Sequence, residues 1–211
     1  FQSILYFEEM RHYLILREYL KVFGEEPNHE DLQKYDTDLK EASWPNTLAM
    51  HWCGELRLGR WYLRWSKDSE EPVLKQVYKL IADDEFRHAQ AYEEFMQQAI
   101  DKDRSLLLPF ANATKWMLLN PDGDKHPTTF SEGSLDGLAV CDRIENYQIF
   151  QGHIQESISE EVEAGLEARV LKTLSRLSGQ ELKSRSDLVR LTLQLQNNSS
   201  ATLPSTNPTF R

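Results

Sequence analysis

Two stretches of this chain nearly repeat each other: "FEEMRHYL" at residues 7–14 and "DDEFRHAQ" at residues 83–90. Each stretch holds an acidic pair, one further residue and then Arg-His. On a helix, residues three apart point the same way, so Glu-x-x-His offers one oxygen and one nitrogen from a single face. The repeat therefore predicts two helices that each carry the same pair of ligand side chains.

The repeated positions give four candidate metal ligands, which are Glu9, His12, Glu85 and His88. One Glu-x-x-His match would be weak evidence, because a solvated acid beside a surface histidine gives the same pattern. Both histidines, however, fall on the apolar faces of their predicted helices. A buried carboxylate is costly unless it is paired or bound to metal. Two copies on two helices therefore favour a metal site over packing alone.

Glu55 is a fifth candidate ligand, because it lies in the predicted helix between the two motifs and shares a face with Trp52 and Tyr62. The alternative is a Glu that pairs with a buried Arg or His. Ferritin-like di-iron and di-manganese bundles take one Glu from each of two helices and Glu-x-x-His from each of two others. The chain fills five of these six ligand positions. We expect the sixth on a helix before Phe1 or, if the chain completes the site itself, at Glu145.

The hydrophobic periodicity predicts an all-α fold, a ferritin-like helical bundle with additional C-terminal helices. Long helices are expected over 2–23, 46–67, 72–100, 134–153 and 158–178, with a short helix within 28–41 and another after residue 178. Trp44-Pro45 is expected to interrupt the helical pattern, with Asn46 as the next N-cap and Pro72 opening the third long helix. One domain is expected over 1–211, with ligand helices in 1–100, a helical extension in 101–195 and an extended tail in 196–211.

The composition excludes several classes of protein. The formal net charge of −10 over 211 residues argues against a dedicated nucleic-acid binder. No apolar run approaches the roughly 20 residues that a membrane helix needs. The two cysteines, Cys53 and Cys141, make no disulfide framework. We therefore expect a cytoplasmic protein that inserts into no membrane and binds no nucleic acid.

Three segments resemble the soluble acyl-acyl-carrier-protein desaturases: "EEMRH" at 8–12, "GELRLGRWYLRW" at 54–65 and "LIADDEFRHAQAY" at 80–92. The second is similar to that family's bridging-Glu helix, and the third is the most specific because it extends well past the ligands. The iron ligands that the resemblance implies are Glu9, His12, Glu55, Glu85 and His88. It also implies two iron ions, dioxygen as oxidant, and removal of two hydrogens from an acyl chain on acyl carrier protein. Electrons would come from a ferredoxin-like donor.

The resemblance assigns further roles. Asp84 would orient a ligand histidine. An acyl channel would be lined by side chains that also suit an ordinary core: Trp52, Leu58, Tyr62, Tyr92 and Met96. Leu58 departs from the family, which has a hydroxyl residue there, and this leaves open a different handling of protons or a different reaction. A basic stripe on the opposite side of the same helix is either a solvated face or a dock for an acidic carrier protein: Arg57, Arg60, Arg64 and Lys67.

Other ferritin-like di-iron proteins remain alternatives: a hydroxylase acting on another substrate, including modified RNA, an iron-storage protein, or a non-catalytic fragment. The family's first ligand helix has no counterpart in this sequence. Its absence would expose apolar helix faces of a size that a monomer rarely tolerates. We therefore expect weak metal binding, and either a homodimer or a C-terminal segment folded over the gap.

Overall fold

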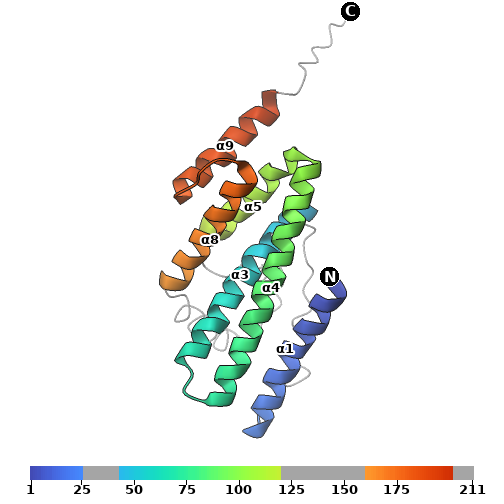
Figure 1. Ribbon diagram of the computed structural model, residues 1–211, viewed down its shortest axis with the longest axis vertical. Coiled ribbons are helices and arrows are strands. Elements are labelled where there is room, and N and C mark those ends of the chain that lie inside the picture. Colours follow the sequence, from blue (N-terminus) through green and yellow to red (C-terminus); the bar gives the residue numbers. More distant parts are fainter. Residues whose placement is uncertain (26–42, 120–159, 202–211) are drawn as a thin grey trace, which may run out of the picture.

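The computed structural model describes residues 1–25, 43–119 and 160–201. Over these residues the backbone is helical apart from short turns and forms no strand (Figure 1). The predicted all-α helical bundle is therefore confirmed. The division of the chain into a single domain with an extension and a tail stays a prediction.

Three long helices carry the predicted ligands: α1 (Gln2–Val22), α3 (Trp44–Asp68) and α4 (Pro72–Lys102). α3 and α4 form a closely packed hairpin, joined by a short turn at one end of the molecule (Figure 1). α1 packs against α4. The two Glu-x-x-His motifs therefore lie on neighbouring helices, as their repetition predicts.

Prolines mark the starts of both helices of the hairpin. α4 begins at Pro72, as predicted, and the side chain of Glu71 caps it by accepting hydrogen bonds from the backbone N–H groups of Val73 and Leu74. The predicted N-cap of α3, Asn46, is wrong by three residues: the N-cap is Ser43, and Pro45 lies inside the first turn. A first-turn residue has no intrahelical partner for its N–H group, so proline is tolerated there.

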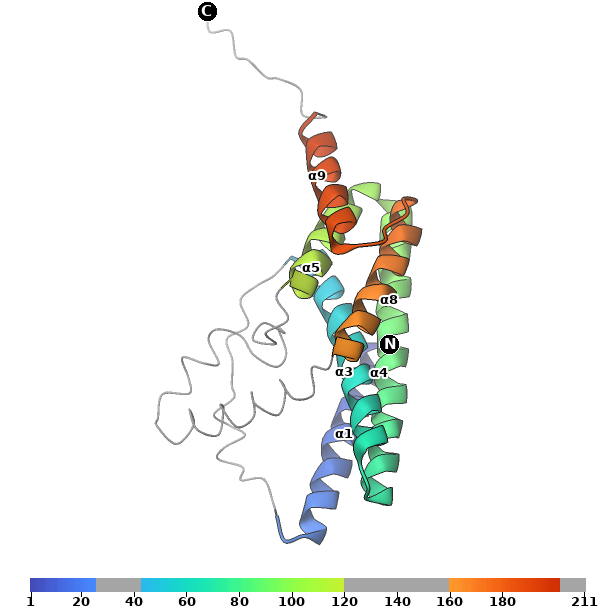
Figure 2. The same ribbon diagram turned by 90° about the vertical axis from the view of Figure 1, so that its left-hand side faces the viewer.

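The C-terminal part packs on the hairpin at the end away from the α3–α4 turn (Figures 1 and 2). It consists of the 3₁₀-helix η1 (Arg104–Leu106) and the helices α5 (Leu107–Leu119), α8 (Glu160–Ser178) and α9 (Arg185–Ala201). α8 confirms the helix predicted over 158–178. α9 continues to Ala201, so residues 196–201 are helical and not the start of an extended tail; no Gly or Pro interrupts the helical register before Pro204.

Several predictions fall outside the described residues. These are the helices over 28–41 and 134–153, Cys141, Glu145 and the tail beyond Ala201.

The main core lies where the hairpin meets the C-terminal helices. Its largest fully buried side chains include Trp52, Phe110, Met96 and Leu174, which come from four different helices. Within α1, all of whose residues are described, His12 alone is buried. α1 is therefore held on the bundle by few apolar contacts, and its polar contacts with α4 matter correspondingly more.

In the part of the chain that the structure describes, no helix combines the length and the apolar character needed to cross a membrane.

Candidate metal centre

Four of the five predicted ligands converge in the space between α1, α3 and α4. One donor atom from each of Glu9, Glu55, Glu85 and His88 lies within 4.8 Å of the donor atoms of the other three. Glu55, Glu85 and His88 are buried, whereas the side chain of Glu9 is 48% exposed. These residues form a group that can hold a metal ion.

His12 joins the same group through its Nδ1 atom. This nitrogen lies 3.7 Å from Glu9 Oε2 and 3.6 Å from Glu85 Oε1. On the other side, Nδ1 of His88 lies 3.4 Å from Glu9 Oε1 and 3.5 Å from Glu85 Oε2. The two imidazole rings are 6.2 Å apart. The structure therefore brings all five predicted residues together, with Glu9 and Glu85 between the two histidines.

Glu55 enters the group from α3. Its Oε2 atom lies 3.6 Å from Nδ1 of His88, so Glu55 lies on the His88 side. The carboxylates with contacts to both histidines are Glu9 and Glu85, on α1 and α4. A bridging role for the Glu on α3 stays a prediction.

Three buried atoms of the group have no hydrogen-bond partner among the residues that the structure describes: Glu55 Oε2, Glu85 Oε2 and His88 Nδ1. A buried polar atom without a partner is costly, and such atoms require an explanation. The nitrogen–oxygen separations of 3.4–3.7 Å are too long for hydrogen bonds. They suit donors that share one cation, with each donor about 2.0–2.2 Å from it. Carboxylate and imidazole ligands fit iron, manganese or zinc. The residues present therefore fit a metal.

Asp84 holds the outer nitrogen of His12. Nε2 of His12 lies 2.9 Å from Asp84 Oδ2, which also accepts a hydrogen bond from Arg11. Arg87 pairs with the other carboxylate oxygen at 2.7 Å. Burial alone would raise the pKa of Asp84, but hydrogen bonds from His12, Arg87 and Arg11 lower it to about 2. Asp84 therefore orients His12 so that Nδ1 faces the carboxylates, which is the predicted arrangement for this residue.

Glu8 does the same for His88, and the sequence analysis missed it. Nε2 of His88 lies 2.8 Å from Glu8 Oε2, and Arg87 donates to Glu8 Oε1 at 2.6 Å. Glu8 occupies the same position in the first motif that Asp84 occupies in the second. The acid that directly precedes the ligand Glu in each motif, Glu8 or Asp84, thus holds the histidine of the other motif. The acidic pair present in both motifs was the signal that identifies Glu8.

The group carries more negative charge than its two histidines neutralise. Burial raises the pKa of Glu85 to about 9, and the neighbouring Glu55 and Glu9 add to this effect. Burial would lower the pKa of His88, but its contacts with Glu55, Glu85, Glu9 and Glu8 raise it to about 12. Without a metal, the cluster therefore keeps protons that a cation would replace.

The predicted channel residues fall into two groups. Trp52, Tyr92 and Met96 are buried in the main core, and Tyr92 stacks on His51 with ring centroids 5.5 Å apart. Leu58 and Tyr62 are half-buried on α3. A channel along these side chains stays a prediction.

Part of the basic stripe on α3 is not the free surface that a carrier dock requires. Arg57 is buried, and it donates to Glu163 of α8 at 3.2 Å and to the carbonyl oxygen of Met117 at 3.0 Å. The guanidinium of Arg60 lies directly beneath Gly165, where a Cβ atom would collide with it.

The two remaining side chains of the stripe lie further along α3. Arg64 pairs with Asp68 at 2.5 Å and with Glu161 of α8 at 3.4 Å. Lys67 is exposed. Arg57 is buried against the acidic first turn of α8 and therefore offers no surface to a carrier. A dock at Arg60, Arg64 and Lys67 stays a prediction.

Comparisons of the chain with protein-family models, with curated proteins and with solved structures find no match. The fold and the site by themselves define an all-α helical bundle with a buried carboxylate–histidine cluster that can hold a metal ion.

Proposed function

We propose that this chain is a ferritin-like di-iron oxidoreductase that uses dioxygen. The observation that carries the proposal is the convergence of Glu9, Glu55, Glu85 and His88 within 4.8 Å, with three buried donor atoms left without hydrogen bonds. Bound iron would supply the electrons that reduce dioxygen, since carboxylate-rich sites with open positions suit this chemistry.

The carboxylates and the histidines would hold the metal ions in different ways. Glu9 and Glu85 reach both histidines and would be shared by the two ions. His12 and His88 would each bind one ion through Nδ1. Asp84 and Glu8 hydrogen-bond with the Nε2 atoms of these histidines. These hydrogen bonds fix each ring in the orientation for metal binding.

For the substrate we propose an acyl chain carried on acyl carrier protein, with desaturation as the reaction and a ferredoxin-like protein as electron donor. The support is the resemblance of the two motif segments and of the α3 segment to the soluble acyl-acyl-carrier-protein desaturases. We also propose a homodimer, because α1 exposes apolar side chains on the side away from α4: Phe7, Met10 and Leu14.

Iron analysis of purified variants tests the metal centre. His12→Ala and His88→Ala should each lower the iron content, and the double variant should lower it further, because each nitrogen would serve a different ion. Glu93→Gln is the matched control: Glu93 is on α4 but pairs with Arg169 and Arg176, away from the cluster. Full iron retention in the double variant would show that the histidines are core residues.

Product analysis separates the possible substrates. The iron-loaded protein is given dioxygen, a reductant and either an acyl carrier substrate, a free lipid or RNA. A double bond in the carrier-bound chain alone supports the desaturase. Hydroxylation of another substrate would identify a related di-iron hydroxylase instead.

Iron storage is a second candidate, because the exposed side chain of Glu9 opens one edge of the cluster to solvent and gives ions a way in. A storage protein would go on taking up and oxidising iron after the cluster is filled. An enzyme would stop at the two ions of the cluster.

A further inference from the structure

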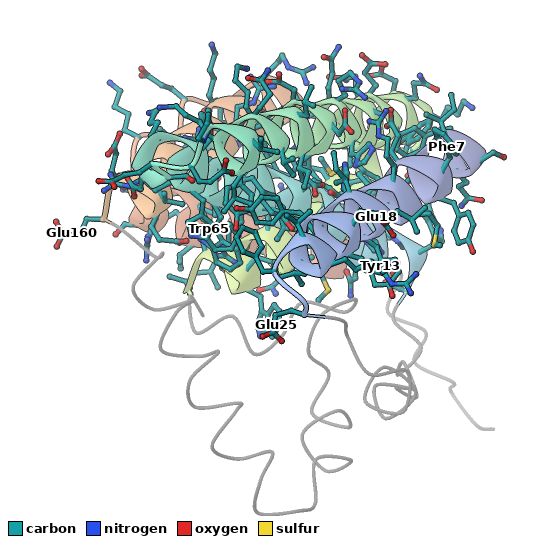
Figure 3. All side chains as sticks on the ribbon, turned by 90° about the horizontal axis from the view of Figure 1, so that it is seen from below. Phe7, Tyr13, Glu18, Glu25, Trp65 and Glu160 are labelled. Carbon is teal, nitrogen blue, oxygen red and sulfur yellow. The ribbon has the colours of Figure 1, made fainter. Side chains whose placement is uncertain are left out.

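Three aromatic rings contact one another near the α3–α4 turn. The ring centroid of Tyr62 lies 5.3 Å from that of Trp65 and 5.9 Å from that of Tyr78. Trp65 and Tyr78 are 5.6 Å apart, so each ring touches the other two. Figure 3 shows Trp65 within a dense group of side chains beside α1. Tyr and Trp are the aromatic side chains that can be oxidised by one electron.

The inner end of this aromatic group points to the metal cluster. Tyr62 follows Glu55 by seven residues on α3, and Tyr78 precedes Glu85 by seven residues on α4. Seven residues are two helical turns, so each tyrosine shares a face with a ligand about 10 Å away along the helix. Burial and then the negative charge of Glu85 raise the pKa of Tyr62, so its phenol keeps its proton.

The outer end of the group is Tyr19 on α1. α1 packs against α4, and Tyr19 contacts Glu71, the residue that caps the start of α4, so Tyr19 lies at the same end of α4 as Tyr78. The hydroxyl of Tyr19 donates a hydrogen bond of 3.2 Å to Glu71 Oε2. An oxidised tyrosine gives up its phenolic proton, and this carboxylate is positioned to accept it.

We propose that Tyr62, Trp65, Tyr78 and Tyr19 form a path along which electrons travel from the protein surface to an oxidised metal centre. This inference rests on the proposed function, because iron held by the cluster, together with dioxygen, would supply the oxidant. The path protects the site when oxidation occurs without substrate.

The transfer balances one electron and one proton. Tyr62 gives one electron to the oxidised centre, and Trp65 or Tyr78 replaces that electron. Tyr19 supplies the last electron and passes its phenolic proton to Glu71. A small reductant at the surface, a thiol or ascorbate, then returns one hydrogen atom to Tyr19, and Glu71 releases the proton to water.

Among residues 1–25, 43–119 and 160–201, the opposite direction along α4 offers no comparable chain of oxidisable rings. Tyr92 follows Glu85 by seven residues, the same separation as for Tyr78. Its described ring partners are Phe1 at 5.3 Å and His51 at 5.5 Å. Phenylalanine is not oxidised under such conditions. Tyr92 also follows the ligand His88 by four residues and so lies at least as near to the cluster as Tyr78. Tyr92→Phe therefore provides a control on the same helix.

Freeze-quench electron paramagnetic resonance tests the path with the metal present. The protein is loaded with ferrous iron and mixed with dioxygen without an acyl substrate. We expect a tyrosyl or tryptophanyl radical in the wild type, loss of that signal in Tyr62→Phe, and a longer-lived radical in Tyr19→Phe because the exit is blocked. Tyr92→Phe should match the wild type. A protein that consumes dioxygen but shows no radical in the wild type or in Tyr19→Phe overturns the proposal.

Pulse radiolysis of the metal-free protein tests the path independently of the metal. Azide radicals oxidise tryptophan, and the absorption of the tryptophanyl radical should convert to that of a tyrosyl radical. The conversion should slow in the double variant Tyr62→Phe, Tyr78→Phe and stay unchanged in Tyr92→Phe. Equal rates in all proteins overturn the path. Transfer in the metal-free protein together with failure of the iron-loaded protein to consume dioxygen means that the proposed function fails while the path stands.

Discussion

The imidazoles of His12 and His88 are each held from the neighbouring helix. Asp84 on α4 binds Nε2 of His12, and Glu8 on α1 binds Nε2 of His88. Because each acid acts through a histidine, its removal should change metal affinity more than the fold. Such outer partners typically change metal affinity or activity by about 10- to 100-fold when they are substituted.

Asp84→Asn tests this role at a single atom. The amide keeps the shape of the side chain but loses the charge that holds the His12 proton, so we expect iron affinity to fall about 10- to 100-fold. The measurement is competition for iron against a chelator of known affinity. Asp83→Asn is the control, since Asp83 is the adjacent acid but is exposed and pairs with Lys79. Equal affinities in the two variants would contradict the orienting role of Asp84.

The thiol of Cys53 should be chemically inert in the folded protein. Burial raises its pKa to about 12, and the thiolate is the reactive form. In a Cys141→Ser background, we expect no alkylation of Cys53 by iodoacetamide until urea unfolds the chain. Mass spectrometry detects the added group. Rapid alkylation under native conditions would show that α3 separates from the core.

At the level of the helices, local rules account for what the sequence predicted well. The three-residue spacing of the motifs and the position of Pro72 fix α1 and α4 without knowledge of the rest of the chain. The burial of Arg57 could not be predicted from local rules, because its partner Glu163 is 106 residues away along the chain. The role of Glu8 could not be predicted without the relative placement of α1 and α4. That placement decides which acid of each pair faces the cluster and which contacts the histidine of the neighbouring helix.

The docking of α1 on α4 should depend on pH in the metal-free protein. The pKa of Asp84 is lowered from 3.8 to about 2, so its contribution is present above pH 3.8 and is lost as the pH falls toward 2. The pKa of His12 is raised from 6.5 despite burial, through Glu9 and Asp84, so its contribution is complete below pH 6.5 and is lost as the pH rises above its folded value. Docking should therefore be tightest between pH 3.8 and 6.5.

Spin labels can follow this docking. Cysteines at the exposed positions Glu18 on α1 and Gln90 on α4 carry the labels in the Cys141→Ser background. Pulsed electron paramagnetic resonance should give a narrow distance distribution within the window and a broader one at pH 2. Asp84→Asn should remove the change on the acid side. A distribution that is the same at every pH would refute the dependence.

For the whole molecule, the contact of α3 with α8 ties the C-terminal part to the hairpin. Arg57 and Glu163 form this contact with side chains that are 7% and 12% exposed. Arg57→Ala leaves Glu163 unpaired, so we expect a loss of about 3–5 kcal/mol in the free energy of unfolding. Urea unfolding measures the loss.

Arg64→Ala is the control for this prediction. Arg64 contacts the same helix, but its side chain is 40% exposed and its partner Glu161 is 75% exposed. Its removal should cost about 1 kcal/mol or less. A similar loss in both variants would show that the buried pair with Glu163 is not special.

The histidine of each motif is held by an acid of the other motif. This arrangement affects when a newly made molecule could acquire a metal ion. The first motif leaves the ribosome long before the second, but its histidine is oriented only by an acid of the second. Neither motif can hold an ion firmly until α4 is complete and lies beside α1. A metal ion would then be taken up at the end of folding and not by the nascent chain. The metal content of a preparation would measure the fraction of molecules in which α1 and α4 have packed together.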